Sequence, residues 1–193
     1  MSSEAIAESL RILDKRAAAA ALKGDTETML NAFLAMKDIE SQLKLDGHCA
    51  KTCMNVANTL IMMKRLDEAL SASKEAAEAF ARCRDRKGEA KANLLSGNIL
   101  AMNSDFVGAK RIAEKESGSS DWTTKGEAHM LFYRIYALEG SREKAQDHIG
   151  RAIRCFDASG GGDSIKIALK ERARFYASIS RPDLAAVDEA RVR

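Results

Sequence analysis

Alanine, or a methionine in its place, recurs at a near-constant interval along this chain. Met29, Ala69, Ala109, Ala145 and Ala185 are separated by 40, 40, 36 and 40 residues, and each follows a turn and the start of an apolar helical pattern. A period in this range is typical of helix pairs that stack on one another. The interval therefore predicts a repeat architecture.

The composition favours long helices over short strands. The chain is 46% hydrophobic and 31% charged, with 5% aromatic residues and Pro182 as its one proline. Alanine, leucine, lysine and glutamate, which favour helices, are common in it. We therefore expect an all-α fold, a right-handed α-solenoid of about five helical hairpins that forms a superhelix.

Turn residues and apolar spacing place the helices. The expected first helices of the hairpins span about residues 5–23, 48–63, 88–102, 124–139 and 164–179. The expected second helices span about residues 26–45, 66–84, 106–116, 142–158 and 182–192. The hairpins then cover about 5–45, 48–84, 88–118, 123–158 and 164–193 of a single domain, 1–193. Side chains suited to accept the free amide hydrogens of a first turn are Asp25, Asp105, Asp121, Ser141, Asp163 and Ser180.

Charge and hydropathy argue against nucleic-acid and membrane partners. The net charge is +3, from 31 basic and 28 acidic residues, which is too small for nonspecific binding to nucleic acid. The longest apolar runs, such as 17–22 and 60–63, fall far short of the roughly 18 residues of a membrane span. We expect neither partner.

The cysteines and the first residues favour a cytoplasmic protein. Cys49, Cys53, Cys83 and Cys155 show no spacing of a disulfide framework, which favours a reducing compartment. Residues 1–13 include two glutamates and lack the basic and then apolar layout of a secretion signal.

No pattern of residues indicates catalysis, a metal or a cofactor. No nucleophile stands near a histidine at useful spacing, and no pair of carboxylates stands out. His48, Cys49 and Cys53 lie close in sequence, but structural zinc needs four ligands, and His129 and His148 belong to another hairpin. Cys53 occupies a packing position and is expected to be buried. We expect a protein that is not an enzyme and holds no metal or cofactor.

The hairpins resemble tetratricopeptide repeats over nearly the whole chain. In residues 92–113, Gly97 takes the small position of the first helix, Leu100 the large one, Phe106 the bulky position after the turn and Ala109 the crossing position. The segment 85–90 (DRKGEA), echoed by 125–128 (KGEA), is similar to the long-period branch that includes spindle-orientation scaffolds and kinesin light chains. The resemblance implies a TPR-like superhelix that serves as an adaptor and holds a peptide in its concave groove.

In such a stack the first helices line the concave side, so equivalent residues form rows along it. Eleven residues before the last four crossing positions stand Asn58, Asn98, Arg134 and Arg174. The resemblance implies that the asparagines bind the partner's backbone, and arginine suits an acidic side chain or a terminal carboxylate. The alternative is that the asparagines brace neighbouring helices and the arginines are solvated.

Two further rows share this helix face. Four residues earlier stand Met54, Leu94, Met130 and Lys170, and four residues later Leu22, Met62, Met102, Leu138 and Ser178. Methionine adapts its shape to varied apolar partners, although Met62 and Met102 could instead belong to the core. Lys51 and Lys91 would flank the groove and attract an acidic ligand, or serve as ordinary surface lysines.

These observations favour a noncatalytic scaffold or adaptor for protein-protein interaction. Its expected partner is a segment of another protein with apolar anchors and acidic residues. Two alternatives stay open: a structural scaffold that self-assembles through its terminal hairpins, and a sensor of a small molecule or signal peptide.

Overall fold

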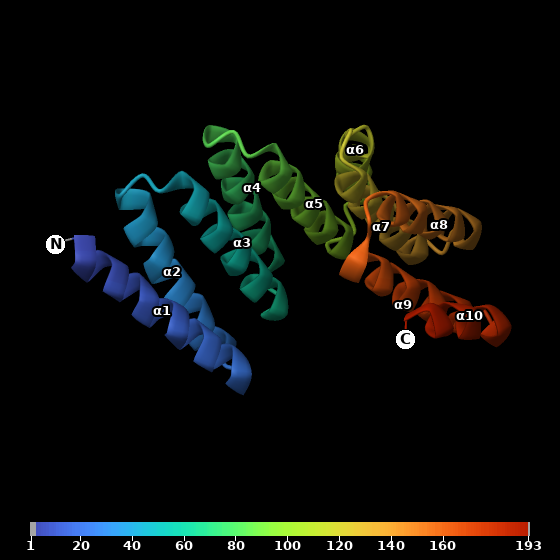
Figure 1. Ribbon diagram of the computed structural model, residues 1–193, viewed down its shortest axis with the longest axis horizontal. Helices are drawn as coiled ribbons and strands as arrows, with labels where there is room; N and C mark the ends of the chain where they lie inside the picture. Colours follow the sequence, from blue (N-terminus) through green and yellow to red (C-terminus); the bar gives the residue numbers. More distant parts are fainter. Residues whose placement is uncertain (1–2, 193) are drawn as a thin grey trace. The chain divides into compact units, whose positions relative to one another are not determined.

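The computed structural model describes residues 3–192 and confirms the all-α class (Figure 1). Over these residues the elements of regular structure are ten helices and no strand. They are α1 (Ser3–Lys23), α2 (Thr26–Gln42), α3 (Asp46–Met62), α4 (Leu66–Arg82), α5 (Arg86–Met102), α6 (Phe106–Ser117), α7 (Trp122–Leu138), α8 (Arg142–Ala158), α9 (Gly162–Ser178) and α10 (Pro182–Val192). Within that range no helix is both long and apolar enough to span a membrane.

The helices follow a rhythm of twenty residues, which is half the sequence period. Helices α2 to α5 have 17 residues each, as do α7 to α9, and a three-residue turn follows most of them. A helix of this length is about 25 Å long. Helix α6 has only 12 residues. Its shortness explains why one interval in the sequence is 36 instead of 40.

Each of these turns contains a residue with a left-handed backbone. Gly24, Gly140 and Gly160 meet this requirement easily, but other turns use residues with side chains. These are Lys44, Lys64, Arg84, Ser104 and Ser180, with φ between 55° and 64°. The backbone then closes each helix end, as where the Leu45 amide donates to the Glu40 carbonyl at 2.9 Å. The turns therefore recur at twenty-residue intervals without a recurrent glycine.

The second helices of the hairpins start where expected, and the first helices start two residues earlier than expected. Gly47, Gly88 and Gly126 suggested boundaries but lie inside α3, α5 and α7. A glycine within a helix can mark close packing instead of an end. Pro182 begins α10 as expected, at a position where its missing amide hydrogen costs nothing.

The expected helix caps are confirmed in part. Asp25, Asp105 and Asp121 accept hydrogen bonds from the amides of Thr28, Gly108 and Thr124. Ser141 occupies the cap position of α8 without a side-chain cap bond, and Asp163 lies inside the first turn of α9. Ser180 is a turn residue that precedes α10 by two positions. Asp85 caps α5 through the Gly88 amide at 2.9 Å, a cap that the sequence analysis missed.

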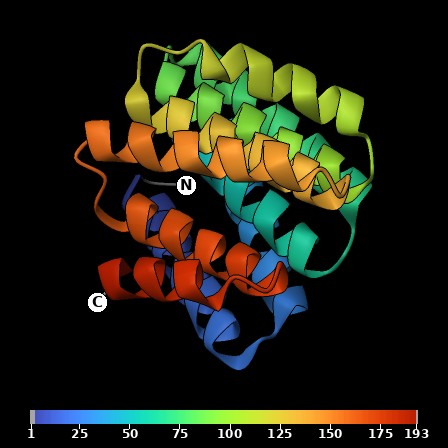
Figure 2. The same cartoon turned by 90° about the vertical axis from the view of Figure 1, so that its right-hand side faces the viewer.

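The chain forms two compact units, Met1–Asn103 and Ser104–Arg193. In the first unit, helices α1 to α5 pack in chain order, each against the next. In the second unit, helices α6 to α10 do the same, and Figure 2 shows α9 and α10 side by side. The border between the units falls between the two helices expected to form the third hairpin.

Small side chains form much of the core of the first unit. Ala57, Ala69 and Ala76 are fully buried, and Cys53 is buried as expected. Small residues let helix axes approach closely. Helices α4 and α5 are also joined through a buried hydroxyl pair, Ser73 and Ser96, with their oxygens 2.7 Å apart.

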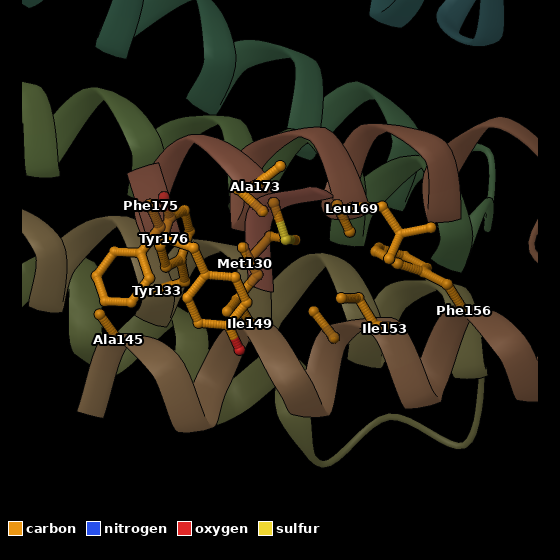
Figure 3. Close-up of a cluster of buried hydrophobic side chains, with 13 residues drawn as sticks. Met130, Tyr133, Ala145, Ile149, Ile153, Phe156, Leu169, Ala173, Phe175 and Tyr176 are labelled. Carbon is orange, nitrogen blue, oxygen red and sulfur yellow. The ribbon is translucent and has the colours of Figure 1, made fainter. Parts of the chain in front are cut away.

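Aromatic side chains fill the core of the second unit (Figure 3). The rings of Tyr133, Phe175 and Tyr176 gather at one end of the buried cluster, and Phe156 lies at the other end. Tyr133 and Phe175 meet edge to face with centroids 6.1 Å apart, a favourable arrangement for aromatic rings. Tyr133 stands where the other hairpins have Ala57, Gly97 and Ala173, and this aromatic cluster accommodates it.

Close packing explains why glycine recurs in the two KGEA segments. A Cβ atom at Gly88 would lie 2.3 Å from Phe80 Cδ1, and one at Gly126 would lie 2.5 Å from Phe156 Cε1. Both distances are too short for a side chain unless the ring moves. Each glycine therefore makes room for a phenylalanine of the neighbouring helix, α4 in the first unit and α8 in the second.

Candidate functional site

Helix α3 exposes several of the residues expected to line the groove. Asn58 and Lys51 are exposed, and Met62, one turn beyond Asn58, is 62% exposed. Met54 is half-buried and packs against the cluster around Cys49 and Cys53. The face of α3 that carries Asn58 and Met62 is therefore open to a ligand.

Helix α5 repeats this pattern with one difference. Lys91 is exposed and Met102 is 52% exposed, but Leu94 is buried in the core instead of lining a groove. Asn98 is half-buried, and its Nδ2 donates to the Leu94 carbonyl at 2.9 Å within the same helix. Its amide group is thus engaged within α5, and this bond does not brace a neighbouring helix.

One row of apolar residues remains exposed at the ends of the first helices. In the first unit it consists of Leu22, Met62 and Met102, and its equivalent in the second unit is Leu138, 61% exposed. The alternative that placed Met62 and Met102 in the core is therefore wrong. Apolar side chains exposed at one repeat position form a candidate contact surface, beside other exposed apolar residues such as Ile12 on α1 and Trp122 on α7.

The row of asparagines and arginines divides between the two units. Asn58 and Asn98 belong to the first, whereas Arg134 and Arg174 belong to the second, where both are exposed. Met130 does not line a surface, because it is buried in the aromatic cluster. Lys170 is exposed on α9, one turn before Arg174.

A pocket opens beside Arg174 in the second unit. Its volume is about 390 Å³, and it lies between the C-terminal halves of α7 and α9 and the start of α8. Its lining residues are Tyr133, Ala137, Gly140, Arg142, Arg174, Phe175, Ser178 and Ile179. A smaller hollow of about 210 Å³ is lined by Arg174 as well, together with Lys170, Ala177 and Glu189.

The pocket combines apolar walls with positive charge. Arg174 Nη1 donates to Glu171 Oε1 at 3.2 Å, but its side chain is 76% exposed and free to turn. Burial, followed by the nearby Glu171 carboxylate, raises the pKa of Tyr133, so its hydroxyl stays protonated near neutral pH. Two guanidinium groups, Arg142 and Arg174, beside apolar walls suit a ligand with both an anionic and an apolar part.

Sequence reasoning found Arg174 but missed most of this pocket. Tyr133, Phe175 and Ile179 were not considered as ligand contacts, and Arg142 lies on a second helix, outside the rows that were considered. Only the packing of α7, α8 and α9 brings these four residues together. The aromatic residue beside Arg174, in the pair Arg174-Phe175, was the available signal.

Three of the four cysteines are buried. Burial raises the pKa of Cys49, Cys53 and Cys155, which keeps these thiols protonated and unreactive. Cys83 is exposed. Among residues 3–192, no three His, Cys, Asp or Glu residues come together as a set able to hold a metal ion.

Comparison with known proteins shows the fold. The sequence matches no protein-family model and no curated protein. The apo form of RapI is similar in structure, with 13% identity and a TM-score of 0.68 over 96% of this chain and 53% of RapI. The chain thus spans about half the length of RapI. BtubC (BKLC) from P. vanneervenii is also similar, with 12% identity and a TM-score of 0.62 over 97% of this chain and 87% of BtubC. The fold of this chain is an all-α helical repeat of the kind found in both proteins.

Proposed function

We propose that this protein is a noncatalytic adaptor that holds a segment of another protein on its first helices. The single observation that carries this proposal is the exposure of Leu22, Met62 and Met102 at equivalent ends of α1, α3 and α5. Leaving these side chains in water has a free-energy cost of about 1.5–3 kcal/mol each relative to full burial. A partner that covers them recovers part of this energy.

The polar neighbours of the row suit a peptide backbone. Asn58 lies one turn before Met62 on the exposed face of α3, and a side-chain amide can both donate to and accept from a peptide unit. Lys51 and Lys91, also exposed, add positive charge to the same unit. The expected ligand therefore has apolar side chains and some acidic character.

The second unit supports the expectation that the ligand carries acidic groups. Its pocket of about 390 Å³ has two arginines at its edge and aromatic rings in its wall. A carboxylate beside an apolar side chain matches these groups in charge and polarity. Peptides held in this way commonly bind with micromolar affinity, about −8 kcal/mol, because ordering the segment offsets much of the contact energy.

The test selects peptides from a displayed random library on the full chain and measures their affinity by fluorescence anisotropy. Selected peptides should contain apolar residues next to Asp or Glu. The double variant Met62→Gln/Met102→Gln should bind them at least tenfold more weakly, because glutamine has a similar shape and is polar. Asn58→Ala/Asn98→Ala should weaken binding several-fold, chiefly through Asn58.

Control variants separate binding from folding. Val107→Gln changes an apolar residue of α6 that is 73% exposed and lies on a second helix, so peptide affinity should stay unchanged. All variants should keep the helicity and melting temperature of the original chain, because the substituted side chains lie outside the buried clusters. Equal binding by the double methionine variant would overturn the proposal, and so would the failure to select any peptide.

A further inference from the structure

Two of the three histidines of the chain meet in the second unit. His129 on α7 and His148 on α8 face each other with their Nδ1 atoms 3.2 Å apart. The third histidine, His48, is exposed on α3. Neither the fold nor the proposed adaptor function requires the contact between His129 and His148.

Aromatic neighbours hold both rings in place. The His148 ring lies 4.5 Å from Phe132 and 5.3 Å from Tyr136, measured between centroids, and His129 lies 6.3 Å from Phe132. Both histidines are half-buried, so each keeps partial contact with water. Rings that are already ordered lose little conformational freedom when a ligand binds.

We propose that His129 and His148 form a binding site for one divalent transition-metal ion such as Zn²⁺, which links α7 to α8. Two nitrogen ligands bonded to one tetrahedral Zn²⁺ at about 2.0–2.1 Å are about 3.3 Å apart. The two Nδ1 atoms already have nearly this separation. Imidazole nitrogen is a preferred ligand of Zn²⁺, Ni²⁺ and Cu²⁺.

Both rings are available as ligands at neutral pH. Burial lowers the pKa of His129 to about 4, with a further contribution from His148, and burial also lowers the pKa of His148. The rings are then neutral, and one Nδ1 proton lies between them in a hydrogen bond. When the ion binds, this proton moves to Nε2 of the same ring through solvent, so no net proton is released.

The surrounding charges limit the affinity. Arg151 and Arg154 oppose a cation near His129, whereas Asp147 favours one but already pairs with Arg151 at 2.9 Å. Lys110 and Lys144 lie over the ring of Tyr136. No third protein ligand from residues 3–192 completes the site, so water fills the remaining positions. We expect micromolar affinity, far weaker than that of a closed structural zinc site.

The experiment titrates the untagged, full-length chain with Zn²⁺ by isothermal titration calorimetry at pH 7.5 in a buffer that does not chelate metals. One Zn²⁺ should bind per chain at this site. His129→Gln and His148→Gln should each weaken it at least tenfold, because glutamine keeps a polar side chain but supplies no imidazole. His48→Gln is the matched control and should leave binding unchanged.

A second measurement keeps the proposal testable if a variant fails to fold. In the original chain, Zn²⁺ should shift the imidazole NMR signals of His129 and His148 and leave those of His48 in place. Binding that persists in the double variant His129→Gln/His148→Gln would assign the ion to other side chains and overturn the proposal. Absence of binding up to millimolar Zn²⁺ would overturn it as well.

Discussion

The two units of this protein build the same kind of helix stack with different side chains. In the first unit, Phe33 and Phe80 are the aromatic residues, and alanines such as Ala57 and Ala76 lie at the helix contacts. In the second unit, Tyr133, Phe156 and Tyr176 fill the core. The comparison teaches that the repeat fixes where helices cross, while the volume between them can be filled in more than one way.

The difference extends to the surfaces. The first unit exposes methionine and asparagine on α3 and α5, whereas the second has a pocket edged by Arg142 and Arg174. Trp122, the single tryptophan, lies in the second unit, so its fluorescence reports on that unit alone.

Removing one ring of the aromatic core should have the largest effect. Phe156 is 3% exposed, and Phe156→Ala should lower the free energy of unfolding by about 3–5 kcal/mol because it leaves a cavity. Guanidinium unfolding followed by Trp122 fluorescence measures this loss. Phe156→Ala also leaves room for a Cβ at Gly126. Gly126→Ala should therefore lower the free energy of unfolding less in the Phe156→Ala variant than in the original chain. Additive losses would contradict the packing described for this pair.

Breaking the ion pair that joins α9 and α10 should cause the next largest loss of unfolding free energy. Arg172 donates to both carboxylate oxygens of Asp188 at 2.7 and 2.6 Å, and Asp188 is 1% exposed. Asp188→Asn should cost about 3 kcal/mol, since it leaves the guanidinium without its counter-charge. The exposed pair of Arg181 and Asp183 is the control, and Asp183→Asn should cost less than about 1 kcal/mol. Equal losses for both variants would contradict this account.

The alanine core should be sensitive to added volume instead. Ala76 is fully buried on α4, and Ala76→Leu should cost about 1–3 kcal/mol through overpacking. Ala81→Leu on the exposed face of the same helix should change stability little. Far-UV circular dichroism measures both variants. If the two units unfold separately, the midpoint of the unfolding transition followed by Trp122 fluorescence should stay unchanged in Ala76→Leu. A shift of that midpoint equal to the shift seen by circular dichroism would show that the units unfold together.

The helix caps provide a smaller test of the same comparison. Asp85→Ala removes the bond to the Gly88 amide at the start of α5 and should cost about 1 kcal/mol. Ser141→Ala at the start of α8 should cost little, because Ser141 makes no side-chain cap bond. Thermal unfolding of the two variants measures the difference, and a larger loss for Ser141→Ala would contradict the cap assignment.

Acid should also weaken the second unit through its histidine pair, by an amount that partial access of both rings to water reduces. The pKa of His129 is lowered from 6.5 to about 4 in the folded chain, and that of His148 is lowered too. As the pH falls, these histidines therefore become protonated at a higher pH in the unfolded chain than in the folded chain. The stabilising contribution is present above pH 6.5 and is lost as the pH falls towards 4. Urea unfolding with EDTA at several pH values, followed by Trp122 fluorescence, measures this loss. His129→Gln/His148→Gln should flatten the dependence, and an unchanged slope would exclude the pair as its source.

The sequence determined the helices of this protein and their order. The crossing positions from Ala69 to Ala185, the starts of the second helices and Pro182 at the first position of α10 were all predicted. These features depend on local interactions such as propensity, capping and apolar periodicity, and a linear pattern carries such information. The exposed row of Met62 and Met102 was also present in the repeat, although its exposure was undecided.

Only the tertiary structure decided which of those side chains face water. It buried Leu94 and Met130, placed Lys44 and Lys64 in left-handed turns, and joined Arg142 to Arg174 around one pocket. It also brought His129 and His148 together across α7 and α8. The physical reason is that exposure and contact depend on which helix packs against a given face, and residues far apart in the chain determine that packing.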